Sequence, residues 1–230
     1  MADASGQQGD QPLVPHLPGR HGPQGGGEGA GGRGDGGAQL DADLLATGDF
    51  QRRATELGVV LRERLEVIRA ELDAPNVPLG IMIEVPSAAV MADQFAKYVD
   101  FFSIGTNDLS QYTMAADRME GELAALLSPW QPAVLAMIRE TCRGGNTTNK
   151  PIGVCGEAGG DPAAALVLVG LGVKSLSMAP GKVNAVRAAL ALHDLETCQK
   201  MAEAALDART AAEAREAVLA LADPVLKDLL

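Results

Sequence analysis

The sequence predicts an α/β fold built around parallel strands. Short apolar segments alternate along the chain with longer segments in which apolar residues recur at three- and four-residue steps. The short segments lack the apolar–polar alternation of a half-exposed sheet, so we expect strands buried on both faces. Four such segments in residues 39–230 are about half of the strands of a (β/α)8 barrel. Parallel βα units predict either a barrel or an open sheet, and the strand count fits about half of a barrel.

The predicted elements start with a helix that ends at the proline-containing turn of residues 73–78. Its apolar stripe is Leu57, Leu61, Leu65, Ile68 and Leu72. The strands are expected at 79–85, 99–105, 151–157 and 174–180. Between and after them, helices are expected at 87–98 (following Pro86, which suits a helix start), 131–142, 161–172 and 181–192, with two Ala-rich helices at the end and a loop at 143–150.

Residues 1–38 differ in composition from the rest of the chain. They contain 13 of the 27 glycines and few large apolar residues, so they cannot bury enough surface to offset the entropy of ordering. We interpret them as a disordered leader, with a wrongly assigned gene start as the alternative. The predicted domain covers residues 39–230.

Composition excludes several classes of partner. The net charge of −11 disfavours nucleic acid and anionic membrane surfaces. The chain has no run of about 18 apolar residues that would cross a bilayer, and its first residues lack the pattern of a secretory signal. Three widely spaced cysteines give neither a disulfide framework nor a metal motif. A cytoplasmic location is expected.

Three of the predicted strands have polar or reactive side chains at or just beyond their C-terminal ends. They are Glu84, Asn107 with Asp108, and Cys155 with Glu157. The C-terminal ends of parallel strands build the active sites of α/β folds, so these groups should converge on one rim.

Glu84 and Asp108 are candidate metal ligands. Two carboxylates, completed by substrate oxygens and water, suit Mg²⁺, and the same ligands accept Mn²⁺. The alternative for Glu84 is an ion pair with Lys or Arg at the sheet edge. The alternative for Asp108 is a helix N-cap. Their placement on neighbouring strand ends favours the metal interpretation.

Two further candidates carry weaker signals. The guanidinium of Arg118 suits a phosphate or carboxylate, and the alternative is a solvated helix arginine. Cys155 is a candidate proton donor, because a free cysteine is mostly a thiol near neutral pH. Its alternative is a small buried apolar residue, which is also how we interpret Cys142 and Cys198.

At these residues the sequence resembles the phosphoenolpyruvate-utilising enzymes, and within them the enzyme I proteins of the sugar phosphotransferase system (phosphoenolpyruvate–protein phosphotransferases). The resemblance runs from about Leu79 to Leu190 and rests on four segments in order: "GIMIEVPSAAVMAD", "VDFFSIGTNDLSQYTMAADR", "KPIGVCGEAGGDP" and "LGVKSLSMAPG". The "QYT" followed by "ADR" is closer to enzyme I than to pyruvate phosphate dikinase or phosphoenolpyruvate synthase.

The resemblance implies that the domain is the C-terminal half of a (β/α)8 barrel, and it implies a role for each candidate. Glu84 and Asp108 would hold Mg²⁺, Asn107 and Arg118 would contact the substrate phosphate, and Cys155 would protonate the enolate carbon as pyruvate forms. The phosphoryl group would pass to a histidine on a separate N-terminal domain, and then to the histidine phosphocarrier protein. The family's C-terminal domain also forms a homodimer.

Some positions depart from the family pattern. Ala158 and Gly159 stand where Met or Leu and then Ala are usual, which predicts a smaller and more flexible loop. Gln131 replaces a histidine found in many relatives. The acceptor-histidine domain and the first barrel strands, with their substrate-binding arginines, are not in this sequence.

Three functions are compatible with these observations. The first is the phosphoenolpyruvate-binding part of a phosphotransferase that serves sugar uptake. The second is a truncated, non-catalytic remnant that acts at most as a binding or dimerisation module. The third, a stand-alone lyase of the phosphoenolpyruvate/pyruvate type, would need a complete barrel.

Overall fold

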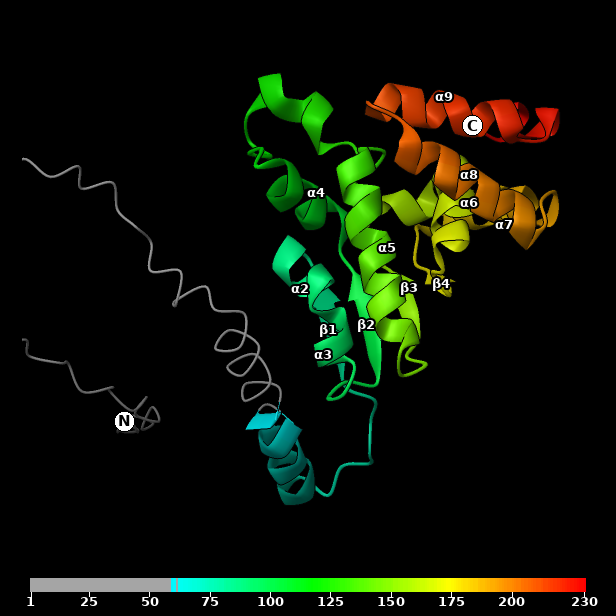
Figure 1. Ribbon diagram of the computed structural model, residues 1–230. Helices are drawn as coiled ribbons and strands as arrows, with labels where there is room; N and C mark the ends of the chain where they lie inside the picture. Colours follow the sequence, from blue (N-terminus) through cyan, green and yellow to red (C-terminus); the bar gives the residue numbers. More distant parts are fainter. Residues whose placement is uncertain (1–58, 61) are drawn as a thin grey trace, which may run out of the picture. The chain divides into compact units, whose positions relative to one another are not determined.

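A computed structural model of the chain describes residues 59, 60 and 62–230 (Figure 1). The expected leader, the boundary between residues 38 and 39 and the start of the first helix lie outside the described residues. The remainder of that helix runs over residues 62–71 and ends before the predicted proline-containing turn.

The centre of the fold is a four-stranded sheet in the order β1-β2-β3-β4. All neighbouring strands are parallel, which confirms the predicted α/β class. The strands are shorter than predicted: β1 is Gly80–Ile83, β2 Phe101–Ile104, β3 Ile152–Val154 and β4 Ser175–Leu176.

The chain segment between β1 and β2 forms two helices where one was predicted. These are α2 (Pro86–Val90) and α3 (Ala92–Phe95), separated at Met91, whose backbone has φ −97° and ψ 13°. A methyl group built on Gly144 would lie 2.6 Å from the backbone nitrogen of Asp93, so the break lies where another helix packs against this segment.

That other helix is α5 (Pro132–Asn146), and it corrects a second expectation. We expected it to end at Cys142, before a loop at 143–150, because glycine weakens helices. Instead it continues through Gly144 and Gly145, both of which are buried. A Cβ on Gly145 would lie 2.8 Å from Ile152 Cδ1, so only glycine permits this close packing. Tertiary contact thus outweighs helix propensity here.

The polar segment after β2, for which no element was predicted, is also helical. It forms α4 (Thr106–Met114) and the 3-10 helix η1 (Gly121–Leu127). The later helices agree with prediction: α6 is Pro162–Leu171, α7 Val183–Ala191, α8 Leu195–Asp207 and α9 Ala211–Leu221. Three short 3-10 helices accompany them: η2 (Glu157–Gly160), η3 (Pro180–Lys182) and η4 (Pro224–Leu229).

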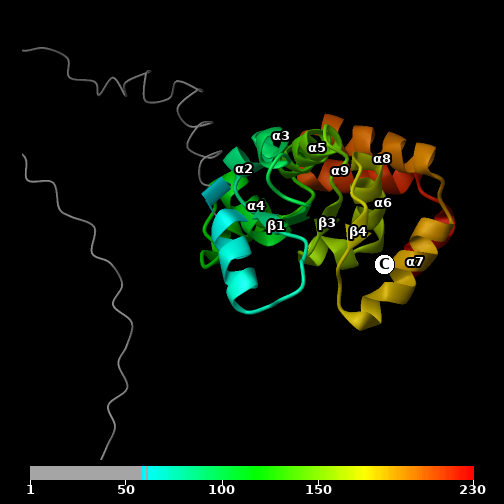
Figure 2. The same cartoon turned by 90° about the horizontal axis from the view of Figure 1, so that it is seen from below.

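One face of the sheet is covered by helices and the other is not. The covered face carries Ile83, Phe102, Ile104, Ile152 and Val154, which are almost completely buried beneath the helices (Figure 2). On the opposite face, Met82 is 49% and Phe101 36% exposed. The expectation of strands buried on both faces is therefore wrong for the described residues, because none of them covers this second face. We call it the open face.

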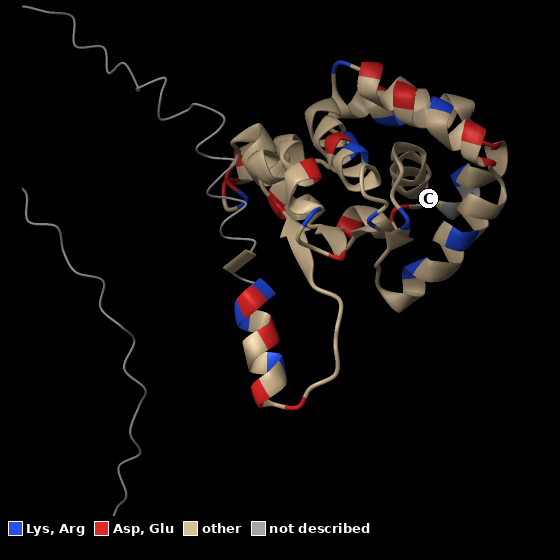
Figure 3. Cartoon of the chain, turned by 60° about the horizontal axis from the view of Figure 1, so that its bottom comes forward, with Lys and Arg blue, Asp and Glu red and all other residues tan. Residues whose placement is uncertain are grey.

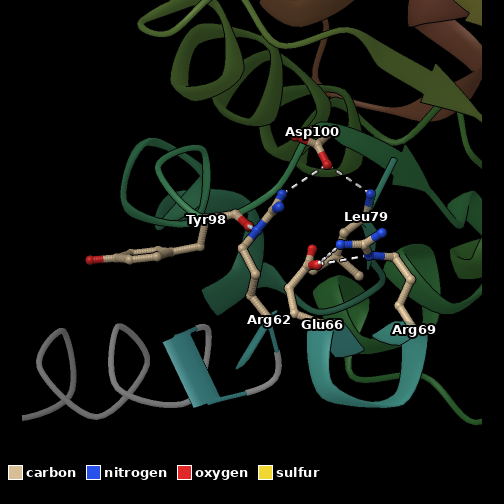
Figure 4. Close-up of polar contacts among 6 residues, drawn as sticks. All are labelled: Arg62, Glu66, Arg69, Leu79, Tyr98 and Asp100. Atoms are coloured by element: carbon tan, nitrogen blue, oxygen red, sulfur yellow. Dashed lines mark hydrogen bonds and ion pairs between the residues drawn. The ribbon is translucent and has the colours of Figure 1, made fainter. Parts of the chain in front are cut away.

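Polar contacts connect the helix of residues 62–71 to the N-terminal ends of β1 and β2 (Figure 4). Asp100 Oδ2 accepts hydrogen bonds from Arg62 Nη2 and from the backbone N–H of Leu79, both at 2.8 Å. Arg62 Nε also donates to the carbonyl of Tyr98 at 3.0 Å. Because these contacts lie at the opposite end of the strands from the candidate residues, they support the sheet and take no part in the site.

Residues of both charge signs occur along this helix and along α8 and α9 (Figure 3). Within the described residues, no helix is both long and apolar enough to cross a bilayer.

Candidate active site

Three residues that directly follow β1, β2 and β3 lie in one row. Ile83, Ile104 and Val154 are register partners, so the next residues, Glu84, Gly105 and Cys155, occupy the same level of the sheet. The backbone ladder continues to this level, because Gly105 N–H donates to Ile83 O at 3.1 Å and Cys155 N–H to Ile104 O at 3.0 Å. Since side chains alternate along a strand, Glu84 and Cys155 share the open face with Met82.

The side chain of Glu84 lies over Gly105. A Cβ on Gly105 would come within 2.7 Å of Glu84 Oε1 and 2.8 Å of its Cγ. The absence of a side chain at position 105 therefore creates the space that the carboxylate occupies. Among the described residues, no lysine or arginine forms an ion pair with Glu84, so the structure gives no support to the alternative of a sheet-edge ion pair.

Asp108 lies in the first turn of α4, and it does not cap the helix. The N-cap residue is Gly105, and no side chain caps this helix. Asp108 Oδ1 instead accepts a hydrogen bond from Arg118 Nη2 at 2.8 Å. The two side chains are 40% and 49% exposed, so this ion pair contributes little stability.

Arg118 is not on a helix, in contrast to the solvated helix arginine considered as its alternative. It lies in the turn that follows α4, and Ala115, with φ 49°, ends that helix. Its backbone N–H donates to Gln111 Oε1 at 3.3 Å. The loop therefore folds back onto α4 and places the guanidinium beside Asp108. Asn107, in the same helical turn as Asp108, is exposed.

Cys155 is exposed, so it is not the small buried residue considered as its alternative. Its Sγ lies 3.4 Å from Met82 Sδ and 3.5 Å from the carbonyl oxygen of Ile104. Cys142 and Cys198 are buried, as predicted. Burial raises the pKa of the Cys142 thiol to about 12 and also raises the pKa of Cys198, so both remain protonated thiols at neutral pH.

The donor atoms fit a magnesium ion that shares its coordination with a substrate. The described residues contain no group of three or more His, Cys, Asp or Glu side chains placed to hold a metal ion. Mg²⁺ commonly uses only one or two carboxylates, together with phosphate oxygens and water. Glu84, directly after β1, and Asp108, in the first turn of α4, supply two carboxylates of this kind, and Asp108 is paired with Arg118 in this structure.

Sequence reasoning missed three residues of this region. Met82 and Gly105 matter through the register of strands distant in sequence, which no local pattern reveals. Thr106 is completely buried against Gly156, and its Oγ1 has no hydrogen-bond partner among the described residues. A glycine at the C-terminal end of each of two predicted strands, at positions 105 and 156, was the one available signal of close packing at this rim.

Two departures from the family pattern also have a structural setting. Ala158 and Gly159 are buried in η2, and a Cβ on Gly159 would lie 2.8 Å from the carbonyl oxygen of Ser177. The loop therefore packs closely against the residue that follows β4. Gln131 is the N-cap residue of α5, and its Nε2 donates to Ala125 O at 3.2 Å.

His193, the histidine within the described residues, is used for structural contacts. His193 Nε2 accepts the backbone N–H of Asp223 at 2.9 Å, so Nδ1 carries the proton and donates to the carbonyl of Ala189 at 2.7 Å. Both ring nitrogens are thus used to tie chain segments together. His16 and His21 lie outside the described residues.

A parallel α/β sheet with two carboxylates, a thiol and an arginine at its C-terminal rim defines a class of enzyme that binds a small anionic substrate. Comparison with known proteins identifies the family. Residues 52–195 match the model of the phosphoenolpyruvate-binding domain of phosphoenolpyruvate-utilising enzymes. The chain belongs to this family.

Several relatives cover most of this chain. A multiphosphoryl transfer protein of Xanthomonas campestris is 52% identical over 157 residues, which are 68% of this chain and 19% of the relative. Phosphoenolpyruvate-protein phosphotransferases are 41% identical over 175 residues in Listeria monocytogenes and 48% identical over 160 residues in Haloferax volcanii, covering 76% and 67% of this chain. The matched regions are 30% and 28% of those two relatives, so the chain spans less than a third of their length.

Proposed function

We propose that this chain supplies the phosphoenolpyruvate-binding site of a phosphotransferase that moves the phosphoryl group of phosphoenolpyruvate to a protein histidine. The observation that carries the proposal is the row formed by Glu84, Gly105 and Cys155, with Asp108 on the following helix and its partner Arg118 in the turn after that helix. It provides metal-ligating oxygens, an anion-binding cation and a thiol on one rim. The family match supports phosphoenolpyruvate as the substrate.

The fold that we propose is half of a (β/α)8 barrel. Its four strands are parallel and follow one another in sequence order, as they do in such barrels. The open face would then be part of the barrel interior, and the strands that close it would come from the region that precedes the matched segment in the longer relatives. This accounts for a sheet face that exposes Met82 and Phe101.

Arg118 and Asn107 would bind the phosphate of the substrate. To do so, the guanidinium must exchange the Asp108 carboxylate for phosphate oxygens. This exchange is cheap because the ion pair is exposed, and a planar guanidinium offers two parallel N–H donors to phosphate. Asp108 is released in the same step and becomes available as a ligand.

Glu84 and Asp108 would hold Mg²⁺, and their oxygens would also accept Mn²⁺. When bound, the metal would neutralise negative charge on the phosphate and enolate oxygens. The chain's own contribution is positional, since one carboxylate comes from the end of β1 and the other from the first turn of α4.

Cys155 would complete the reaction. Cleavage of the bond between phosphorus and the enol oxygen transfers the phosphoryl group to a histidine nitrogen and leaves the enolate of pyruvate. The S–H bond of Cys155 then breaks, the hydrogen forms a new bond at C3 of the enolate, and pyruvate results. The thiolate recovers a proton from water. An exposed thiol on the rim can reach both substrate and solvent.

The complete activity would involve other parts of a longer protein. The acceptor histidine and the histidine phosphocarrier protein, the homodimer and the role in sugar uptake are proposed by analogy with the phosphotransferase relatives. A cytoplasmic location suits three cysteines that all remain free thiols. The second candidate function is a non-catalytic binding module. The open face favours it, because none of the described residues closes the site on that side.

Isothermal titration of the chain with phosphoenolpyruvate, with and without Mg²⁺, tests the proposal. We expect binding that requires Mg²⁺ and is lost in a Glu84→Gln, Asp108→Asn double variant. A Glu203→Gln, Asp207→Asn variant removes two exposed carboxylates of α8 and should bind as the wild type does. A folded wild-type chain that binds no phosphoenolpyruvate would leave only the binding-module function.

A further inference from the structure

Met82 has an unusual environment for a large apolar side chain. It lies in the middle of β1, points to the open face and is 49% exposed. Its sulfur nevertheless reaches across β2 to Cys155, which follows β3, and the distance from Sδ to Sγ is 3.4 Å. The path is open because β2 contributes only the small residues Ser103 and Gly105 to the row between them.

We infer that Met82 is a positioning residue for Cys155: its thioether accepts the thiol hydrogen and keeps Sγ on the open face, in the row that also contains Glu84. The inference rests on the proposed function, in which this thiol donates the proton that converts the enolate into pyruvate. Methionine suits such a role, because its sulfur is a weak, polarisable acceptor on a flexible chain.

The alternative partner of the thiol shows why a positioning residue is needed. The carbonyl oxygen of Ile104 also lies within reach, at 3.5 Å from Sγ. That oxygen already accepts the backbone N–H of Cys155 at 3.0 Å. Without the thioether, the thiol hydrogen would turn towards this backbone carbonyl and away from the open face. Met82 therefore competes with the sheet for the hydrogen and keeps the thiol available to a substrate.

This arrangement assigns Met82 no chemical step of its own. Rotation about the Cβ–Sγ bond of Cys155 turns the S–H away from the weak thioether acceptor and towards C3 of the enolate. The thioether itself neither gains nor loses a proton. A variant that lacks the sulfur should therefore protonate the enolate more slowly without losing affinity for the substrate. Such a variant should lower the rate of enolate protonation and leave the half-saturating substrate concentration unchanged.

Vibrational spectroscopy of the thiols tests the contact without requiring activity. Raman spectra of the chain contain an S–H stretching band for each cysteine, and a Cys155→Ser variant identifies the band of Cys155. We expect this band to shift in Met82→Leu, which conserves volume but removes the acceptor. Met137→Leu, a change on α5 away from the site, should leave it in place. An unshifted band in Met82→Leu would overturn the inference.

Exchange of the pyruvate methyl hydrogens with D₂O, followed by NMR in the presence of Mg²⁺, tests the role in the reaction. We expect Cys155→Ser to abolish exchange. Met82→Leu should slow exchange about 10-fold and leave the half-saturating pyruvate concentration unchanged. A 10-fold loss is smaller than the ~100-fold loss that a 1 Å misplacement of a reacting group can cause. Equal rates in Met82→Leu and wild type would overturn the inference.

The two measurements separate this inference from the proposed function. If the wild-type chain exchanges no hydrogens, the proposed function fails for this chain, and a shifted Raman band would then reduce Met82 to a structural contact. If exchange occurs and depends on Cys155 but not on Met82, the proposed function stands and the inference fails. Thermal unfolding of each variant confirms that the fold is retained.

Discussion

At the scale of single residues, the site depends on glycine as much as on its reactive groups. Residue type and position at predicted strand ends were sufficient to predict Glu84, Asp108 and Cys155 as candidates. They could not predict Gly105, because its importance comes from the carboxylate of a neighbouring strand that lies over it. Strand register, which the sequence does not display, decides such contacts.

Replacement of Gly105 by alanine should impair the site and spare the fold. The added Cβ would lie 2.7 Å from Glu84 Oε1, and this flexible carboxylate can move away at little cost. Gly105 has φ −87°, which alanine also adopts. We expect Mg²⁺-dependent phosphoenolpyruvate binding to weaken about 10-fold, which is 1.4 kcal/mol. Isothermal titration measures the affinity.

Gly121→Ala is the matched control, since no atom lies within 4 Å of the added methyl group. This variant should bind like the wild type. If Gly105→Ala retained full affinity, the position of the Glu84 carboxylate would be irrelevant to binding.

At the scale of elements, tertiary packing gives two helical segments boundaries that differ from those predicted from the local sequence. Helical periodicity correctly predicted α6, α8 and α9. It failed for α5, where two glycines indicated a loop although their buried contacts favour a helix, and for the segment before β2, where one predicted helix became two. In both places, the deciding interaction joins α5 to residues distant in sequence.

Gly144→Ala should therefore destabilise the protein although alanine is the better helix former. Its Cβ would lie 2.6 Å from the backbone nitrogen of Asp93, and backbone cannot move aside as a side chain can. The expected loss is about 1–3 kcal/mol of unfolding free energy, against a propensity gain of about 1 kcal/mol. Urea denaturation measures the difference. Gly181→Ala, with nothing within 4 Å, is the control, and a stabilised Gly144→Ala would refute the close contact.

Burial of Cys142 on α5 should make stability fall at alkaline pH. The folded pKa is about 12, whereas a cysteine in the unfolded chain titrates near 8.5. Above pH ~8.5 the unfolded state therefore releases a proton that the folded state keeps, and stability falls towards pH 12 by at most ~1.4 kcal/mol per pH unit. Below pH ~8.5 this contribution is constant.

A Cys142→Ala variant checks the sign of this effect. It should be less stable at pH 7, because it leaves a small cavity, but it should lose less stability between pH 8 and pH 10.5 than the wild type. Urea denaturation at a series of pH values gives the comparison. Parallel pH profiles for the two proteins would mean that the Cys142 thiol is not protected from ionisation.

At the scale of the whole molecule, the sheet presents one covered face and one open face. The α/β class and the parallel order could be predicted from alternating segments, and the structure confirms them. The alternation of segments could not show whether both faces of the sheet are buried, because burial depends on which other segments pack against the sheet. If the sheet is half of a barrel, as we propose, strands beyond those described would cover Met82 and Phe101.

The exposed aromatic on the open face should make the chain bind apolar probes. Phe101 is 36% exposed in the sheet, and a contiguous apolar surface of this kind attracts hydrophobic dyes and other chains. We expect Phe101→Ser to lower the fluorescence of anilinonaphthalene sulfonate. Val90→Ser removes a 58% exposed side chain on α2 and should have a smaller effect. Equal effects of the two changes would show that the open face is not the principal apolar surface.

The central claim is that Glu84, Asp108 and Cys155 belong to one metal-dependent site. Cys155 is the exposed thiol of the three, so a trifluoromethyl label can be attached to it selectively. Titration with paramagnetic Mn²⁺ then reports the distance between metal and label through broadening of the fluorine NMR signal. The account predicts strong broadening in the wild type that is lost in Glu84→Gln, Asp108→Asn. No broadening, or equal broadening in both proteins, would contradict it.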